Sequence, residues 1–250
     1  MNMQSHLLLA MALEQHIKDK YGVQLRSDMF YYGNIRPDLT PRWMKKYPHT
    51  FQESLPMFLR QCRILMFHSR HMQPPMYILS YRLGVICHYT ADFFTYAHCD
   101  PILFQKPGPH YRYENELYQA LWKSKGQDPG LPSDVGLRLD EYLRLVMKQY
   151  RRQNPSDPVR DAGFIYHVAL KVCDRMVERI YMEKKNRCKG LFSSGKDAQG
   201  ILRERARTRR HARKVAYEWE NYWPVNQSGF IANTVEQRAG YWPGRYDEND

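Results

Sequence analysis

One segment in the first half of the chain combines an apolar helical pattern with two metal-ligand side chains. Apolar residues recur at three- and four-residue steps from Met76 onward, which predicts a helix from Met76 to Tyr96. His88 and Asp92 are four positions apart in this segment, so both side chains should project from one face of the helix. His98 follows where the periodicity ends, and a turn there would bring it back towards the same space.

A second pair of the same kind follows. His110 and Glu114 also have one-turn spacing, and Leu117 and Leu121 continue the pattern of a helix to about Lys125. Imidazole nitrogen and carboxylate oxygen are ligands that suit zinc, and a bridging carboxylate can hold two ions a few ångströms apart. Two pairs and a lone histidine in so short an interval favour a polynuclear metal site over separate helix-surface contacts.

Two further candidate ligands lie near the start of the chain. Ser5 is a suitable N-cap for a first helix to about Lys20, which places His6 in the first turn of that helix. Asp38 lies in residues 31–41, where a glycine and two prolines predict a loop without regular structure.

The rest of the chain is also predicted to be helical. Thr50 and Glu53 have capping-box spacing at the start of a helix over residues 50–69, and His49 directly precedes that helix. No long segment has the alternation expected of strands, and the sequence has no internal repeat. We therefore expect an all-α protein with a single multi-helix domain over 1–222, metal ligands within 1–125, further helices over 134–152, 158–187 and 198–222, and an extended tail over 223–250.

Size, charge and cysteine content narrow the possible functions. The 250 residues suffice for one substantial core, and the net charge of +12 favours polyanions such as nucleic acids, anionic membrane surfaces or phosphorylated ligands. The five cysteines contain no C-x-x-C pair, so neither a disulfide scaffold nor a thiolate zinc site is expected. The amino-terminal segment lacks the basic residues that begin a signal peptide. No apolar run reaches the roughly 20 residues that span a bilayer. We therefore expect a soluble, cytoplasmic protein.

The order of the candidate ligands resembles that of the zinc-dependent phospholipase C family and its relatives, the single-strand-specific zinc nucleases. The family pattern is His-x3-Asp-x5-His followed by His-x3-Glu or His-x3-Asp, which stands here as His88, Asp92 and His98, then His110 and Glu114. Upstream, the family has a histidine near its amino terminus, a Pro-Asp loop and another histidine, which match His6, Pro37-Asp38 and His49. The resemblance covers residues 1–123 and implies an all-α fold of the phospholipase C and zinc nuclease type.

The resemblance also implies how the ligands are shared between metal ions. One zinc ion would be bound by Asp38, His49, His88 and Asp92, and a second by His98, His110 and Glu114. Asp92 would bridge to a third ion held by His6, which the family completes with the amine of an amino-terminal Trp exposed by cleavage of a leader. This chain begins Met1-Asn2 without such a leader, and our hypothesis is that the Met1 amine substitutes for that of the Trp.

The implied activity is phosphoester hydrolysis with two or three zinc ions. Zinc lowers the pKa of a shared water from 15.7 towards about 7, and Asp38, a ligand on a loop, is also the candidate proton acceptor. Leu39 stands where the family's phosphatidylcholine enzymes have a Tyr of the choline pocket, so a choline-lipid substrate is not implied. A phospholipid and a nucleotide both remain possible substrates. The alternatives are a nuclease or phosphomonoesterase with the same centre, or a basic helical protein that binds nucleic acid or membranes and has structural zinc.

A basic segment lies within the last predicted helix. Residues 203–214 contain seven Arg or Lys residues in twelve, and helical spacing would align Arg203, Arg207, Arg210 and Lys214 in one stripe. A solvated helix face accounts for this pattern as well as a contact does. Arg203–Lys214 is therefore a candidate contact for an anionic membrane or a nucleic acid, with the solvated face as the alternative.

Overall fold

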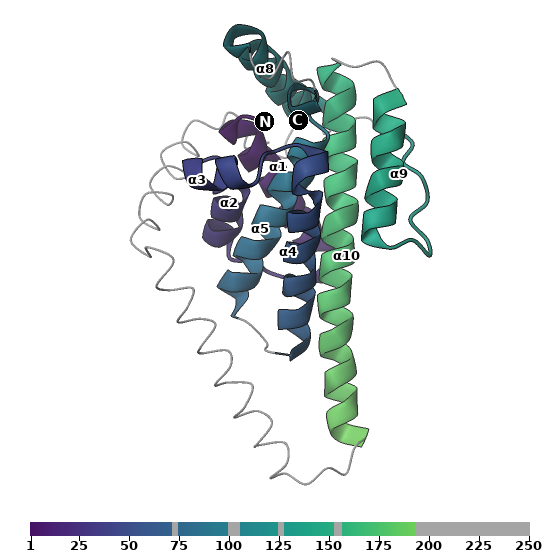
Figure 1. Ribbon diagram of the computed structural model, residues 1–250. Coiled ribbons are helices and arrows are strands. Elements are labelled where there is room, and N and C mark those ends of the chain that lie inside the picture. Colours follow the sequence, from purple (N-terminus) through teal and green to yellow (C-terminus); the bar gives the residue numbers. More distant parts are fainter. Residues whose placement is uncertain (72–74, 100–105, 125–127, 153–156, 194–250) are drawn as a thin grey trace, which may run out of the picture. The chain divides into compact units, whose positions relative to one another are not determined.

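The computed structural model describes residues 1–71, 75–99, 106–124, 128–152 and 157–193, which belong to one compact unit, Met1–Gly195. Regular structure in these residues is helical throughout, and this confirms the all-α prediction (Figure 1). The helices are α1 (Met3–Tyr21), α2 (Ser27–Ile35), α3 (Pro41–Lys46), α4 (Phe51–His71), α5 (Met76–Phe93), α6 (Tyr96–Cys99), α8 (Pro107–Ser124), α9 (Leu139–Arg152) and α10 (Pro158–Ser193). The predicted helix over 198–222, its basic segment Arg203–Lys214 and the tail over 223–250 lie outside the described residues.

Helix α5 is the buried centre of the described helices. Every residue from Ser80 to Phe93 is buried, because α5 packs against α2, α4 and α10 (Figure 1). The helix ends at Phe93 rather than at the predicted Tyr96, because the Phe94 amide donates to the Ala91 carbonyl at 3.1 Å in a tightened last turn. The short helix α6 follows at once and contains His98. The change of direction expected before His98 is therefore present.

The prediction of an irregular loop over residues 31–41 was wrong for residues 31–35 and for Pro41, which are helical, and right for residues 36–40, which form a turn that contains Asp38. Helix α2 runs through Gly33, and α3 begins at Pro41, a proline at the first position of a helix. Gly33 does not break the helix, because it lies at the crossing of α2 with α5. A Cβ atom at Gly33 would lie 2.2 Å from the Tyr81 carbonyl oxygen, and one at Gly84 would lie 2.3 Å from the Phe30 carbonyl oxygen. Two glycines at this contact let the backbones of the two helices approach closely.

The beginnings of two other helices differ from the predictions. Helix α1 is capped by Asn2 rather than by Ser5, and the Asn2 side chain accepts a hydrogen bond of 2.9 Å from the Ser5 amide. Ser5 is buried in the first turn instead, with His6 next to it. Helix α9 begins at Leu139 rather than at residue 134, because Gly136 has a φ of 74°, which lies outside the helical region. None of the described helices is long and apolar enough to cross a membrane.

Candidate metal centre

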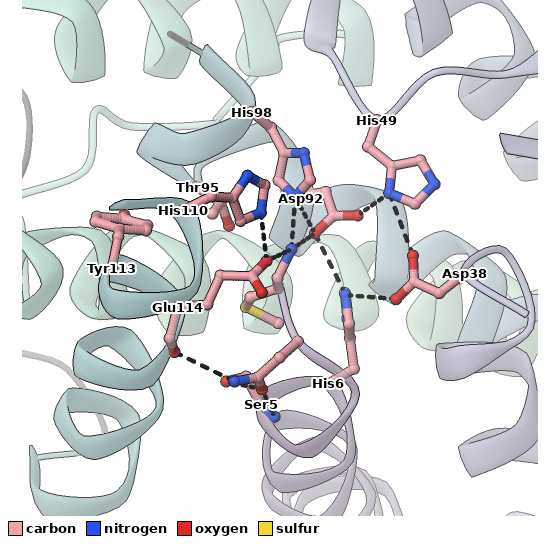
Figure 2. Close-up of polar contacts among 12 residues, drawn as sticks. Ser5, His6, Asp38, His49, Asp92, Thr95, His98, His110, Tyr113 and Glu114 are labelled. Atoms are coloured by element: carbon pink, nitrogen blue, oxygen red, sulfur yellow. Dashed lines mark hydrogen bonds and ion pairs between the residues drawn. The ribbon is translucent and has the colours of Figure 1, made fainter. Parts of the chain in front are cut away.

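Eight side chains predicted as ligands come together at one end of α5. His6 comes from α1, Asp38 from the turn between α2 and α3, and His49 from the segment just before α4. The others come from α5, α6 and α8: His88, Asp92, His98, His110 and Glu114. Figure 2 shows the carboxylate of Asp92 surrounded by His6, His49 and His98, with Asp38 to one side and Glu114 to the other.

Four of these residues form the tightest group. The ligand atoms of Asp38, His49, His88 and Asp92 all lie within 4.8 Å of one another. Asp92 Oδ2 is 2.8 Å from His49 Nδ1 and 3.1 Å from His88 Nε2. Asp38 Oδ1 is 3.4 Å from His49 Nδ1 and 3.7 Å from His88 Nε2. The resemblance implied this same set for one zinc ion, and three of its four members are buried.

The other oxygen of Asp92 faces the remaining candidate ligands. Asp92 Oδ1 lies 3.3 Å from His6 Nε2 and 3.5 Å from His98 Nε2. Beyond His98, His110 Nε2 lies 3.1 Å from Glu114 Oε1, and the His98 and His110 rings have centroids 5.9 Å apart. Asp92 is therefore the one carboxylate that reaches histidines of all three predicted sites.

The amine of Met1 lies inside this cluster. Its nitrogen is 2.9 Å from Asp92 Oδ1, 3.2 Å from Glu114 Oε1 and 2.5 Å from His98 Nε2. Burial alone would lower the pKa of the amine, but the carboxylates of Asp92 and Glu114 raise it to about 10. The amine thus lies where the hypothesis of a Met1 ligand requires it to lie.

Burial and mutual repulsion keep two of the imidazoles neutral. Burial together with the nearby His88 lowers the pKa of His6 to about 4. Burial and the Met1 amine hold the pKa of His98 well below its usual value. Burial would raise the pKa of Asp92, but the Met1 amine and His88, whose own pKa is raised, outweigh it, so the pKa of Asp92 lies well below its ordinary value. The neutral imidazoles of His6 and His98 and the ionised carboxylate of Asp92 are the forms that bind metal ions.

Unpartnered buried atoms provide a test of whether a metal ion fits here. Within the described part of the chain, His6 Nε2, His88 Nε2 and Asp92 Oδ2 are buried without a hydrogen-bond partner. Leaving buried polar atoms unsatisfied costs about 1–3 kcal/mol each, so such groups rarely persist without a purpose. His88 Nε2 lies 3.1 Å from Asp92 Oδ2, and His6 Nε2 lies 3.3 Å from the other oxygen, Oδ1, so cations bound on the two sides of the Asp92 carboxylate would satisfy these atoms. The donor set of imidazole nitrogen and carboxylate oxygen matches zinc.

One supporting residue for His88 was not identified from the sequence. His88 Nδ1 lies 2.7 Å from the carbonyl oxygen of Asn34 at the end of α2. A carbonyl can only accept, so Nδ1 carries the proton and Nε2 is left to face the carboxylates. The close crossing of α2 and α5 at Gly33 and Gly84 places this carbonyl within reach. No local signal marks Asn34, because its partner is 54 residues away.

Asp161 connects α10 to the two helices that supply His98, His110 and Glu114. Its Oδ2 accepts a hydrogen bond from the hydroxyl of Tyr113 on α8 and one of 3.0 Å from the amide of Tyr96 on α6. Arg160 Nη2 lies 3.2 Å from Oδ1. Tyr113 directly precedes Glu114, and Tyr96 lies two residues before His98, so Asp161 sets the distance between these ligands. Sequence reasoning missed this residue, which lies in the first turn of α10.

Comparison with known proteins agrees with the geometry. A model of the zinc-dependent phospholipase C family matches residues 5–157, a span that contains all eight candidate ligands. Comparison with curated proteins gave no match, and comparison with solved structures gave none. The family match covers more than half of the 250 residues and includes all or most of each helix that supplies a candidate ligand. This chain therefore belongs to the zinc-dependent phospholipase C family.

Proposed function

We propose that this protein hydrolyses phosphodiesters with a two- or three-zinc centre. Asp38, His49, His88 and Asp92 would hold one ion, and His98, His110 and Glu114 a second. Asp92 would also reach a third ion at His6 and the Met1 amine. The observation that carries the proposal is the position of Asp92, whose two oxygens lie within 3.5 Å of four different histidines.

The chemistry divides between the metal and the protein. Bound zinc supplies Lewis acidity, which makes water acidic enough to be a nucleophile near neutral pH and withdraws charge from phosphoryl oxygens. The protein holds the ligands in place beforehand, as the Asn34 carbonyl does for His88. Asp38 is the proton acceptor that we favour, because its side chain is 23% exposed while Asp92 is fully buried. Asp38 alone in the four-residue group can thus contact both the ligands and an incoming substrate.

The proposal specifies the reaction but leaves more than one class of substrate open. A phospholipid or a nucleotide would each present the phosphodiester that this centre requires, and a nuclease or phosphomonoesterase would use the same ligands. A basic binding protein with structural zinc is the alternative of a different class. The exposure of Asp38 favours catalysis over structural zinc, because structural zinc sites are closed by their ligands.

The test measures zinc-dependent cleavage of a generic aryl phosphodiester by the zinc-loaded protein. His88→Ala and Asp92→Asn should each lower the rate by more than roughly a hundredfold, since that is the upper figure for residues that merely support a ligand. His16→Ala is the matched control, because His16 lies on α1 outside the cluster and contacts Asp174. The control should keep its activity. Circular dichroism should show that all three variants remain folded.

Two outcomes would contradict the proposal. One is cleavage that persists at full rate after chelation of zinc, or in the folded His88→Ala and Asp92→Asn proteins. The other is absence of cleavage for lipid, nucleotide and small phosphoester substrates, combined with binding to nucleic acid or membranes that survives chelation. The second outcome would favour the binding protein.

A further inference from the structure

Residues 38–49 supply two of the four ligands in the tightest group, Asp38 at the start and His49 at the end. The other two, His88 and Asp92, come from α5. Between Asp38 and His49 lies α3, a helix of 6 residues in which no residue is buried. So short a helix is not stable by itself in water. The position of these two ligands relative to α5 therefore depends on contacts that hold the segment in place.

Tyr89 makes such a contact with the middle of the segment. Its side chain is fully buried on α5, directly after His88. The Tyr89 hydroxyl accepts a hydrogen bond of 2.8 Å from Trp43 Nε1 in the first turn of α3. The same hydroxyl donates a hydrogen bond of 3.1 Å to the carbonyl of Tyr47, the C-cap of α3. An indole N–H can only donate and a carbonyl can only accept, so this one hydroxyl holds both ends of the helix.

The ring of Tyr89 also lies against two of the ligands. Its centroid is 5.5 Å from that of His49 and 5.3 Å from that of His88, and both contacts are edge-on. A change of Tyr89 to Phe would keep these ring contacts and remove only the hydroxyl. The role of the hydroxyl can therefore be tested separately from the packing of the ring.

The outer parts of the segment are attached to other helices. The Asp38 amide donates a hydrogen bond of 3.2 Å to the carbonyl of Ile35 at the end of α2. The Ser54 hydroxyl on α4 donates to the carbonyl of Pro48. Tyr89 instead joins the segment directly to α5, the helix that carries the other two ligands of the group.

We propose that Tyr89 is a positioning residue for the zinc ion that this four-residue group would hold. By fastening α3 to α5, its hydroxyl keeps Asp38 and His49 at the distances from His88 and Asp92 that the ion requires. The inference rests on the proposed zinc centre and adds to it a residue that binds no metal. Groups that orient ligands contribute roughly 10–100-fold to metal affinity, so loss of the hydroxyl should have an effect of that size. The ion expected at α6 and α8 should be unaffected, because its ligands come from other elements.

The test titrates the zinc-loaded, full-length protein with a chromophoric chelator in the absence of substrate. Two ligand variants assign the steps of zinc release: His49→Ala should remove the step of the four-residue group, and His110→Ala the step of the ion at α6 and α8. Tyr89→Phe should weaken the first of these steps by roughly 10–100-fold and leave the second within about twofold. An unchanged first step, or equal weakening of both steps, would overturn the proposal.

Tyr21→Phe is the matched control, because it also removes a hydroxyl that has two partners on another helix. The Tyr21 hydroxyl lies 2.9 Å from Asp174 Oδ1 and 2.9 Å from Glu178 Oε1, and it joins α10 to the end of α1 opposite His6. Each variant should lower the melting temperature of the zinc-free protein by a few degrees, because each loses hydrogen bonds that stabilise the fold. Only Tyr89→Phe should weaken a step of zinc release. Equal zinc affinities in the two variants would show that Tyr89 stabilises the fold alone.

A second variant removes the same hydrogen bond from its other side. Trp43→Phe lacks the donor Nε1 and leaves Tyr89 unchanged, so it also serves if Tyr89→Phe does not fold. It should weaken the same step of zinc release. Because the two changes remove one shared hydrogen bond, the loss of affinity in the double variant should be smaller than the product of the two single losses. A loss equal to that product would mean that the residues act independently, which would contradict the proposal.

Failure of this inference is distinguishable from failure of the proposed hydrolysis, because zinc affinity is measured without substrate. Weakening of one step in Tyr89→Phe, with no phosphoester cleaved by the unaltered protein, would remove the proposed function and keep the positioning role. Zinc affinity of Tyr89→Phe equal to that of the unaltered protein, with cleavage by the latter, would do the reverse.

Discussion

The amine of Met1 contacts the carboxylates of two candidate ligands, Asp92 and Glu114. A positive charge that is fully buried between Asp92 and Glu114 is tolerated because two carboxylates surround it. Its pKa is raised from 8.0 to about 10 in the folded protein. The folded state therefore holds the proton more tightly than the unfolded state does. This contribution to stability is complete below pH 8 and is lost as the pH rises towards 10.

A short Gly-Ser extension at the amino terminus should remove that contribution, because it converts the amine into a neutral amide. Urea unfolding of the metal-free protein should show a free energy of unfolding that falls by roughly 3 kcal/mol between pH 8 and pH 10 for the protein that starts at Met1. The extended protein should lack most of this fall. The buried thiols of Cys62 and Cys87 have raised pKa values and act in the same direction, but they do so equally in both proteins.

The same pair of proteins tests Met1 as a metal ligand. Loss of one zinc ion per chain on extension is the result expected if the amine completes the third site with His6. Equal zinc content and equal activity in both proteins would argue against the Met1 amine as a ligand. Superimposable stability profiles between pH 8 and pH 10 would contradict the buried ion pair itself.

Local spacing identified the candidate ligands but not the groups that orient them. His88 and Asp92, like His110 and Glu114, are one helical turn apart, so a single sequence shows that each pair shares a face. Asn34 is 54 residues from His88, and the amide of Tyr96 is 65 residues from Asp161. Such contacts depend on how helices cross, and no periodicity within one helix encodes them.

Among the elements, the crossing of α2 and α5 determines whether His88 is oriented. Its two glycines lie in contact, with a Cβ at Gly84 only 2.9 Å from the Gly33 Cα. From the sequence, Gly33 with the prolines that follow it was interpreted as the sign of a loop, because glycine is more often a breaker than a packing residue. Here Gly33 and Gly84 are both buried where the two helices cross, so Gly33 is a packing residue and α2 continues through it. Helix α5 itself was predicted nearly correctly, since its long apolar periodicity is a strong signal.

Gly84→Ala should therefore weaken the metal site without altering any ligand. The added methyl group would lie 2.3 Å from the Phe30 carbonyl oxygen, so α2 must move away and carry the Asn34 carbonyl with it. We expect a loss of about 1–3 kcal/mol in the free energy of unfolding and a loss of roughly 10–100-fold in zinc affinity. Chemical denaturation and competition with a zinc chelator measure the two effects.

Gly108→Ala is the control for this substitution. Gly108 lies in the first turn of α8, and a Cβ there would have no heavy atom within 4 Å. Its free energy of unfolding should stay within about 0.5 kcal/mol of the unaltered protein. Unchanged zinc affinity in Gly84→Ala would show that the Asn34 carbonyl does not orient His88.

At the scale of the whole molecule, the candidate ligands connect segments that are far apart in the chain. They extend from His6 to Glu114 and come from α1, the α2–α3 turn, the start of α4, α5, α6 and α8. Asp161 adds α10 to this set through Tyr113 and the Tyr96 amide. Bound zinc would therefore act as a cross-link between most of the described helices. The unfolded chain presents no such site, so zinc binding adds to the stability of the folded state.

Removal of zinc should accordingly lower the melting temperature. With free zinc at about a thousand times its dissociation constant, the gain is roughly 4 kcal/mol, which for a chain of this size corresponds to about 10 °C. Differential scanning calorimetry before and after chelation measures the shift, and readdition of zinc should restore it. Asp92→Asn should show no zinc-dependent shift, because Asp92 reaches all three predicted sites. The His16→Ala protein should shift as the unaltered protein does. A melting temperature that is independent of zinc in the unaltered protein would mean that the folded state does not bind zinc, and the centre would then need another explanation.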